Sequence, residues 1–424
     1  MSSDNETSMN CTERYAAHEP NVNPVSIDVR YPAHIFIENF LPGTLLLVRV
    51  FMITWLAFGL FGNSLSLVIW ASKPQRRKNT SAIYLAALSL TDFLLILCLI
   101  NYHVVRYWGL YGIDQYPGMC EIYQSLSIFL QYFSTILVFG FTLERYIAVC
   151  FPFKRHKLCT AKRAIIAVVI LALICLIPTL FQTALWKFNG TECVMKDELI
   201  SDSTVRGVLT GMEVLFSLTV PLAALVFNLL LLKEMRRLIK STAVPTPTVF
   251  ATQNGTSSTN TPQVEAPRSR ESSGFVATTV MLVILSFYLI ACAVPPGVMY
   301  LAQFGWVGHD PCLTDEAMKA DPKWQLMFWR MKAKEITDVM CSSHYALNIF
   351  IYVFTSKAFR MQAFWMLTCN KEKLLRMNKP AAADKWTFSR RTAPRRMRHV
   401  EEQRSLISEP DGRSENKQNC GNGN

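Results

Sequence analysis

The sequence contains few charged residues for its length. Only 17% of its 424 residues are Asp, Glu, Lys or Arg, whereas soluble globular proteins average about 25%. Hydrophobic residues make up 51% of the chain and fall in long runs separated by short polar, basic stretches. This distribution is typical of a membrane protein and argues against a soluble protein of two or more domains.

Several patterns that would indicate chemistry are also missing. The twelve cysteines form no CxxC pair, which removes the usual zinc and thiol-redox signatures. There is no His-Glu-x-x-His helix or other nucleophile–base spacing, so the sequence predicts no enzyme and no bound cofactor apart from the sodium ion discussed below. An internal repeat, which many transporters carry, is also absent.

The start of the chain and its charge exclude two further classes. The first ten residues, MSSDNETSMN, have no apolar core, so they predict no cleaved signal peptide and leave the first apolar run as the anchor. The net charge is +12, but Lys and Arg lie between apolar runs and in the tail. That placement predicts no nucleic-acid partner.

Seven apolar segments predict seven transmembrane helices, because a bilayer core of about 30 Å needs about 20 apolar residues. The last is the weakest, since it contains Asp338, His344 and Asn348. The predicted spans are 46–70, 82–103, 120–150, 164–186, 205–232, 275–304 and 336–354.

The connecting stretches predict orientation and domain organisation. Dense Lys and Arg in 73–78, 154–163, 233–240 and the tail alternate with stretches of mixed charge. By the positive-inside rule, the C-terminus is cytosolic and the N-terminus extracellular. The predicted domains are an extracellular N-terminus (1–45), a seven-helix domain (46–369) and a disordered cytosolic tail (370–424). Residues 241–274, rich in Ser, Thr and Pro, are predicted to form a disordered inner loop.

Three Asn-x-Ser/Thr sequons fall on the predicted outer side, at Asn5, Asn10 and Asn189. They are candidate N-glycosylation sites, although such triplets also arise by chance.

Polar motifs inside the spans point to one family. The motifs, in chain order, are Gly62-Asn63, Leu88-Ser-Leu-Thr-Asp92, Cys120, Glu144-Arg145-Tyr146, Cys193, Pro221, Cys292-Ala-Val-Pro295, Asn348-Ile-Phe-Ile-Tyr352 and Lys357-Ala-Phe-Arg360. Their order and spacing, including the 25 residues from Cys120 to Arg145, resemble the rhodopsin-like (class A) G-protein-coupled receptors over roughly residues 45–369. The resemblance implies an all-α membrane fold, a seven-transmembrane helix bundle with a short interfacial eighth helix.

The resemblance implies roles for the cytosolic residues. Arg145 should pair with Glu144 in the inactive state and face the G-protein in the active state, with Tyr146 beside it. Pro295, Asn348 and Tyr352 are the corresponding switch residues of the sixth and seventh helices. The alternative for Arg145 is an interfacial arginine without a signalling role.

The resemblance also implies bound and covalent features. Asp92, Ser134 and Asn348 would surround one allosteric sodium ion; the alternative is a protonated Asp92 with hydrogen bonds only. Cys120 and Cys193 would form a disulfide, and Cys369 is a candidate for palmitoylation. Two further cysteines, Cys11 and Cys312, are predicted to lie outside and form a possible second disulfide.

Some family residues are replaced, which puts the standard switching details in doubt. Ala293 stands where the sixth helix usually has Trp, Ile349 follows Asn348 where Pro is usual, and Leu229 replaces a fifth-helix Tyr. The sixth helix then needs another switch residue, for which Phe287 and Tyr288 are the candidates.

The predicted outer pocket favours a peptide ligand. Ser127 replaces the Asp of amine receptors and Ser342 the Lys of opsins. The pocket instead offers charges of both signs and several aromatic side chains, and a third outer loop at 305–334 enlarges the outer surface. The predicted pocket residues are Tyr102, His103, Arg106, Gln131, Glu213, Tyr300 and Asp338, with Lys334 and Glu335 close by.

Two stretches, around Glu144–Arg163 and Asn79–Asp92, are similar to invertebrate neuropeptide receptors, including the FMRFamide-receptor-like group. The similarity implies a plasma-membrane receptor with a neuropeptide ligand, a heterotrimeric G-protein, receptor kinases, arrestin and membrane lipids as partners. The alternatives are a receptor for a lipid or other small molecule, and a seven-helix transporter. For Glu213 and Asp338, internal ion pairs or rim solvation remain an alternative to ligand binding.

Overall fold

The computed structural model describes residues 11–16, 21–23, 26–78, 80–151, 153, 157–189, 193–196, 198–199, 202–242, 268–302, 310–370 and 372. The chain divides into a unit of Met1–Leu367 and a unit of Thr368–Asn424, and the fold below is that of the first. The predicted sequons Asn5 and Asn10 and nearly all of the predicted tail lie outside the described residues.

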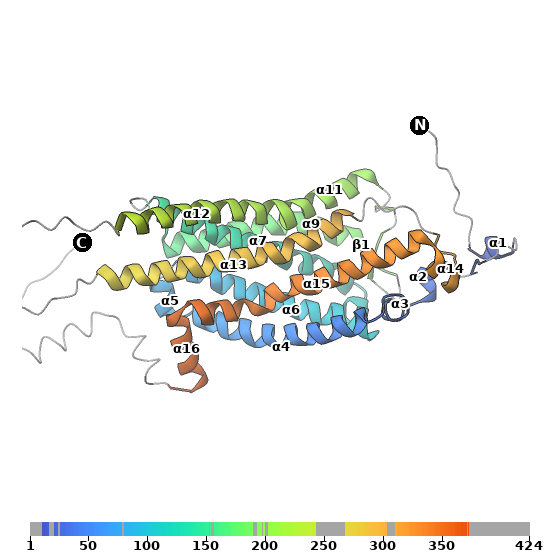
Figure 1. The fold of residues 1–424 in the computed structure, drawn as a ribbon, viewed down its shortest axis with the longest axis horizontal. Helices are drawn as coiled ribbons and strands as arrows, with labels where there is room; N and C mark the ends of the chain where they lie inside the picture. The colour runs from blue at the N-terminus through green and yellow to red at the C-terminus, as the bar shows by residue number, and fades with distance from the viewer. Residues whose placement is uncertain are drawn as a thin grey trace, which may run out of the picture. The chain divides into compact units, whose positions relative to one another are not determined.

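Seven long helical stretches form the bundle in the described part of this unit (Figure 1). They are α4 (Thr44–Trp70), α6 (Ser81–Trp108), α7 (Met119–Cys150), α9 (Ala161–Leu185), the continuous run α11 (Ser203–Glu213), η2 (Val214–Thr219) and α12 (Val220–Thr242), then α13 (Arg268–Ala302) and α15 (Pro322–Thr355). α7 is central and packs against α6, α9, α12 and α13, while α15 closes the bundle against α4 and α13.

Six of these stretches are long and apolar enough to cross a membrane, from α4 through α13. α9 gives the clearest argument for a membrane span. Its 18-residue apolar segment has a mean hydropathy of 3.0, yet only 17% of that segment is buried inside the protein. Its exposed side chains include Ile166, Ile177 and Leu180. A continuous apolar surface of this kind is stable against lipid and not against water, so the chain is a multi-pass membrane protein.

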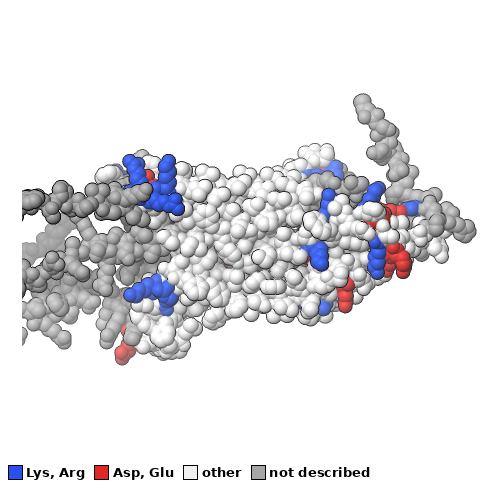
Figure 2. Space-filling view, viewed as in Figure 1, with Lys and Arg blue, Asp and Glu red and all other residues white. Residues whose placement is uncertain are grey.

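Charged side chains gather at the two ends of the bundle and are sparse along the face between them (Figure 2). We call these the α14 end, which carries α1–α3 and α14, and the α16 end, which carries α5 and α16. α5 spans Lys73–Lys78, α14 spans Asp315–Ala320 and α16 spans Lys357–Leu367.

The Gly62-Asn63 motif has a packing role. A Cβ placed on Gly62 would lie 2.8 Å from Ile349 Cγ2 on α15, closer than real side chains approach. Glycine therefore lets α4 approach α15, where Asn63 Nδ2 donates to the Tyr345 carbonyl at 2.8 Å. Ile349, which stands where the family usually has Pro, has a β-branched side chain that faces Gly62. α4 and α15 can pack this closely at Ile349 only because Gly62 has no side chain.

The α14 end is an ordered structure of short elements. α1 (Cys11–Ala16), α2 (Ile27–Arg30) and α3 (Ala33–Phe40) lie in the N-terminal segment, and β1 (Trp186–Phe188) pairs with β2 (Cys193–Met195) as a hairpin. η1 (Ile113–Gln115) precedes α7. The structure joins Cys120 to Cys193, which confirms the predicted disulfide and fixes the hairpin to the start of α7.

A second set of contacts, here called the clasp, holds residues 11–40 against residues 310–324. The structure joins Cys11 to Cys312 by a disulfide. Arg30 and Tyr31 both donate to the Asp315 carboxylate, at 2.9 and 2.7 Å, and the bond to Asp315 raises the pKa of Tyr31 above its usual value. A protonated Tyr31 is therefore favoured as the donor.

Two predicted boundaries differ from the helix ends in the structure. The third outer loop was placed at 305–334, but α15 begins at Pro322, where the Asp321 side chain caps it. The disordered inner loop was placed at 241–274, but α12 continues to Thr242 and α13 begins at Arg268. Both stretches are rich in polar residues, and a helix that extends beyond the membrane needs no apolar run, so hydropathy alone could not locate these helix ends. Residues 243–267 lie outside the described part of the chain.

α16 is attached to the ends of α4 and α15 by a small core. Trp70, Tyr352 and Phe359 pack with ring centroids 5.3–5.5 Å apart, and Gln75 and Gln362 are hydrogen-bonded at 3.1 Å. Phe364 and Leu367 are exposed on this helix, so it presents an unburied apolar face.

Candidate functional site

An ion pair lies at the α14 end of the bundle, between α6 and α15. Arg106 Nη2 donates to Glu335 Oε1 at 2.8 Å, and the Tyr107 hydroxyl donates to the same carboxylate. Glu335 is 2% exposed, whereas the Arg106 side chain is 30% exposed. The arrangement ties α6 to α15 and leaves part of the Arg106 side chain accessible.

Aromatic rings surround this ion pair. His103 stacks on Tyr107 with centroids 5.1 Å apart, and Tyr102 lies under the Arg106 guanidinium at 5.9 Å. His103 is only 4% exposed. Tyr102 and Arg106 are therefore partly accessible, whereas His103, the third predicted pocket residue of α6, is buried against Tyr107.

Glu213 differs from Glu335 in its partners, which among the described residues are two hydroxyl groups. It ends α11, and it accepts hydrogen bonds from the Tyr132 hydroxyl at 3.2 Å and from Ser217. The π-turn η2 follows directly, and its Phe216 stacks on Tyr132 at 4.2 Å. Glu213 is half-buried, and no Lys, Arg or His of the described residues forms an ion pair with it.

Asp338 forms an ion pair within the protein, which the sequence analysis left open as an alternative to ligand binding. Lys334 Nζ lies 2.5 Å from Asp338 Oδ2, one turn earlier on α15. Both side chains are about one-third exposed, at 34% and 35%. The pair is thus internal, although its exposure leaves both groups open to a competing ligand charge.

The remaining predicted pocket residues lie on other helices. Gln131 is exposed on α7, next to Tyr132, and Tyr300 is half-buried near the end of α13. The Arg106–Glu335 pair belongs to α6 and α15, so the predicted pocket residues are spread over separate walls of the bundle.

A buried polar centre lies in the middle of the bundle. Ser134 Oγ donates to Asp92 Oδ1 at 2.7 Å, and Asn348 Nδ2 donates to Asp92 Oδ2 at 2.8 Å. Asp92 is fully buried, and Ser134 and Asn348 are 1% and 3% exposed. The structure brings together the three residues that the sequence predicted, from α6, α7 and α15.

At the α16 end, Arg145 is buried at 4% exposure. Its Nε donates to Ser81 Oγ at 2.7 Å, and the neighbouring Glu144 accepts from the Thr80 hydroxyl. Both residues of the predicted pair thus bind hydroxyl groups at the start of α6. These bonds hold the end of α7 against α6.

The sixth helix contacts its neighbours through hydroxyl groups. Thr142 and Ser286 are 3.1 Å apart, which links α7 to α13, and the Tyr288 hydroxyl lies 2.7 Å from Ser343 Oγ on α15. Phe287 is exposed, so Tyr288 is the better candidate for the missing switch residue. Pro295 and Pro296 lie inside α13, toward the α14 end.

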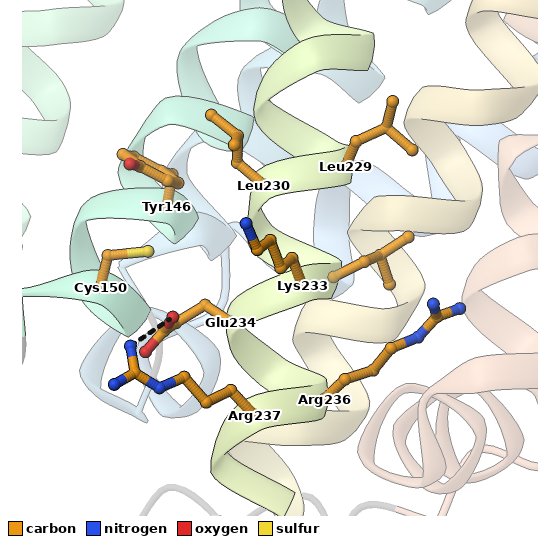
Figure 3. Close-up of a pocket in the computed structure, with 9 residues that line it drawn as sticks. Tyr146, Cys150, Leu229, Leu230, Lys233, Glu234, Arg236 and Arg237 are labelled. Carbon is orange, nitrogen blue, oxygen red and sulfur yellow. Dashed lines mark ion pairs between the residues drawn. The ribbon is translucent and has the colours of Figure 1, made fainter.

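A cavity of about 750 Å³ opens between the last turns of α7 and α12 (Figure 3). Tyr146 lines it, together with Cys150 and the α12 residues from Leu229 to Arg237. The other switch residue of this end, Tyr352, is fully buried against Trp70 and Phe359.

Comparison with known proteins decides the family. Residues 62–352 match the model of the 7 transmembrane receptor (rhodopsin family). The chain belongs to this family.

Relatives of the receptor include a secretagogue receptor and two receptors named for peptides. It is 25% identical over 113 residues to growth hormone secretagogue receptor type 1 of Rattus norvegicus, covering 27% of this chain and 30% of that protein. It is 27% identical over 139 residues to the FMRFamide peptide receptor frpr-18 of Caenorhabditis elegans, covering 32% of each. Neuropeptide receptor 18 of the same organism is 28% identical over 120 residues, covering 27% and 25%. The chain thus aligns with about a third or less of each relative's length.

The polar centre of the receptor is a candidate cation site. Asp92 and Ser134 offer oxygen atoms, which hard cations prefer, and each Asp92 oxygen accepts one hydrogen bond and has a second lone pair. Asn348 presents its amide nitrogen to Asp92, so its amide would have to turn before its oxygen could bind a cation.

Two of the predicted modification sites lie among the described residues. Asn189 follows β1 in the chain and is exposed. Cys369 follows α16 in the chain, is exposed, and has a φ of 52°, in the left-handed region.

Two structural features differ from the sequence prediction. Glu335 was placed near the pocket but before the seventh span, whereas Glu335, Val339, Ser342 and Ala346 form one buried stripe of α15. This three-to-four-residue spacing is the signal that the helix extends beyond its apolar part. The π-turn before Pro221 has no comparable signal, since nothing in Val214–Thr219 is polar enough to mark it.

Proposed function

We propose that the receptor crosses the plasma membrane seven times, binds an extracellular peptide and activates a heterotrimeric G-protein. α15 is the seventh span, and α16 is an interfacial eighth helix whose exposed Phe364 and Leu367 contact lipid. The two named nematode relatives support the peptide as ligand class.

The two ends of the bundle support the orientation. Both disulfides are at the α14 end, and disulfides persist in oxidising, extracellular surroundings. The α16 end carries exposed cations such as Lys162, Arg163 and Arg236, as the positive-inside rule requires of the cytosolic side. Asn5, Asn10 and Asn189 then lie outside and are proposed to carry glycans.

Glu213 is the observation that carries the ligand proposal. A half-buried carboxylate held by two hydroxyl donors, with no cation among the described residues, is set to receive a positive charge. A peptide's N-terminal amine or an Arg side chain supplies that charge. Arg106, whose side chain is partly accessible, is placed for the opposite charge of the same peptide.

Replacing Glu213 with Gln is expected to lower peptide potency about 100-fold, because an ion pair in a desolvated pocket contributes about 3 kcal/mol. Calcium and cyclic AMP responses to a neuropeptide library would be measured in cells with matched surface expression. Glu316→Gln, on exposed α14, is the control and should respond as wild type. Equal potency in Glu213→Gln would contradict the assignment; responses only to lipids or small molecules would overturn the peptide ligand itself.

Signalling is proposed to run through the α16 end. Peptide binding to the active state would shift the population toward it. Arg145 would leave Ser81, and the Thr142–Ser286 contact would part as α13 moves outward. Arg145→Ala is the non-signalling control in the same cells. Receptor kinases and arrestin are proposed to act on the Ser- and Thr-rich inner loop and tail, and Cys369 is proposed to be palmitoylated.

Sodium is proposed to bind Asp92, Ser134 and Asn348 and to favour the inactive state. Raising sodium against potassium is expected to weaken peptide binding in wild type, whereas Asp92→Asn should make affinity independent of sodium. Radioligand binding in membranes would test this. Ser89→Ala is the control, because the Ser89 hydroxyl donates to its own helix at Leu85. A sodium effect that survives Asp92→Asn would rule the site out.

A further inference from the structure

The helix α15 has no proline after its first residue, since Ile349 stands where the family usually has one. Sharp bends in a helix need an identifiable cause, such as proline or a side chain that inserts into the hydrogen-bond ladder. α15 offers the second of these in its buried middle, where three polar side chains follow one another. Ser342, Ser343 and His344 are 8%, 3% and 3% exposed, and each bonds back to its own helix.

These back-bonds add donors to carbonyl groups that already accept from the helix amides. Ser342 Oγ donates to the Asp338 carbonyl, four residues earlier, at 2.8 Å. Ser343 Oγ and His344 Nδ1 each donate to the carbonyl three residues earlier. Serine back-bonds of this kind weaken a helix slightly and often bend it. Residues 340–344, here called the polar segment, are therefore less rigid than a helix of apolar residues.

The His344 ring is only partly satisfied in this conformation. Its Nδ1 carries the proton that the carbonyl accepts, so Nε2 is left as an acceptor. Nε2 is buried, and the described residues offer it no hydrogen-bond partner. A buried polar atom without a partner makes a conformation less stable, so the polar segment is not locked by its own side chains.

Contacts on both sides of the polar segment fix α15 to α4. Toward the α14 end, Trp55 Nε1 of α4 donates to the Val339 carbonyl at 3.1 Å. Toward the α16 end, Asn63 Nδ2 of α4 donates to the Tyr345 carbonyl at 2.8 Å. Both bonds hold the backbone of α15 and not a side chain that could change its rotamer. A weakened segment between two fixed points is where a long helix bends most easily.

α13 reaches the polar segment through a hydroxyl group. α13 and α15 lie side by side (Figure 1), and the Tyr288 hydroxyl lies 2.7 Å from Ser343 Oγ. Because Ser343 uses its one hydrogen on the Met340 carbonyl, Tyr288 is the donor. Cys292 of α13 also contacts Ser343, with sulfur and oxygen 3.8 Å apart, but a thiol is a weak donor. The Tyr288 bond is therefore the stronger of these two links.

We propose that residues 340–344 are a hinge that takes the place of the missing proline, and that Tyr288 holds this hinge in one position. As α13 moves away, the Tyr288–Ser343 bond breaks and the turns of α15 beyond Tyr345 tilt about the polar segment. Those turns carry Tyr352 and the attachment of α16, so movement of α13 reaches this end of the receptor through α15. The role in signalling rests on the proposed function, whereas the hinge itself does not.

The hinge is tested without peptide or G-protein, by double electron–electron resonance on the full-length receptor in nanodiscs. Spin labels would be attached at Ile166 and Phe354, which are exposed near the α16 ends of α9 and α15. A ketone-bearing unnatural amino acid carries each label, so the native cysteines stay unlabelled. Since α15 rises about 15–20 Å from the polar segment to Phe354, a tilt of about 15° moves this label by about 5 Å.

Wild type is expected to give one narrow distance distribution, whereas Tyr288→Phe adds a second population shifted by about 5 Å. Losing one hydrogen bond changes the equilibrium about tenfold, which raises a state of about 5% to about one third. Tyr123→Phe is the matched control, because its hydroxyl joins α7 to α6 by a bond of the same length, 2.7 Å to the Cys98 carbonyl. An unshifted Tyr288→Phe, or the same shift in Tyr123→Phe, would overturn the role of Tyr288.

The double variant Ser342→Ala/Ser343→Ala separates a hinge from a simple contact between two helices. It removes the acceptor of Tyr288, but it also removes the two hydroxyl groups that weaken α15. A hinge predicts a second population less than about half as large as in Tyr288→Phe, because the helix is then more rigid. A second population as large as in Tyr288→Phe would overturn the hinge.

Amide hydrogen exchange of the wild-type receptor covers the case in which the variants do not fold. Residues 342–345 of α15 and 132–138 of α7 are all buried. Because amides of the first group share their carbonyl acceptors with side chains, they should exchange at least about tenfold faster than the second group. Equal protection of the two groups would overturn the proposal even if signalling were intact.

Discussion

Replacing Glu335 with Ala is expected to destabilise the receptor by about 3 kcal/mol, because it leaves the Arg106 guanidinium and the Tyr107 hydroxyl without their shared acceptor. This loss of about 3 kcal/mol is at the low end of the range for removing one partner of a buried ion pair, because the Arg106 side chain is 30% exposed. In a thermal unfolding assay of the solubilised receptor, the apparent Tm should fall by roughly 6–12 °C.

The double variant Arg106→Gln/Glu335→Gln distinguishes a lost ion pair from lost packing. It removes both charges and keeps two side chains able to hydrogen-bond, so more than half of the loss should be recovered. Glu316→Ala, on the exposed face of α14, is the matched control and should leave the Tm unchanged. If the double variant unfolds at or below the Tm of Glu335→Ala, the pair is not the source of stability.

Removing the Cys11–Cys312 disulfide is expected to open the clasp at the α14 end. In Cys11→Ser/Cys312→Ser, the loss of the covalent tie should cost about 2–4 kcal/mol. Amide hydrogen exchange in residues 27–40 should then accelerate roughly 30- to 1000-fold. The bundle core should exchange as before, because α3 packs against the outer ends of α4, α6 and α15 and not against the buried polar centre.

The other clasp contacts decide how complete this opening is. Arg14–Asp310 and Arg30–Asp315 are partly exposed pairs, which contribute little by themselves. The packing of Ile27, Phe40, Met318 and Trp324 contributes more. Cys369→Ser controls for loss of a cysteine as such. Unchanged exchange in residues 27–40 would mean that this apolar packing holds the clasp without the disulfide.

The clasp also bears on ligand access. It fixes the N-terminal segment to the first turns of α15, the helix that carries Glu335 and Asp338. Any peptide reaching Glu213 enters from the same end of the bundle, so peptide association should be faster in the variant without the Cys11–Cys312 disulfide, provided that the receptor remains folded.

The family and the positions of the helices follow from the amino-acid sequence alone. Apolar runs and polar residues at membrane depth are local properties, and lipid imposes them strictly because an unpaired polar group in hydrocarbon is costly. The resemblance of these motifs to the receptor family grouped Asp92, Ser134 and Asn348. The same resemblance implied the Cys120–Cys193 disulfide that the protein contains.

Which charges meet depends instead on the tertiary packing. Arg106 pairs with Glu335, 229 positions away, while Asp338 pairs within its own helix. Among the described residues, the partners of Glu213 are hydroxyl groups. All three carboxylates look alike in sequence, because composition reports depth in the membrane and not rotation about the helix axis. That rotation is set by how the helices pack, as where α6 meets α15 and where Phe216 of the π-turn after Glu213 stacks on Tyr132 of α7.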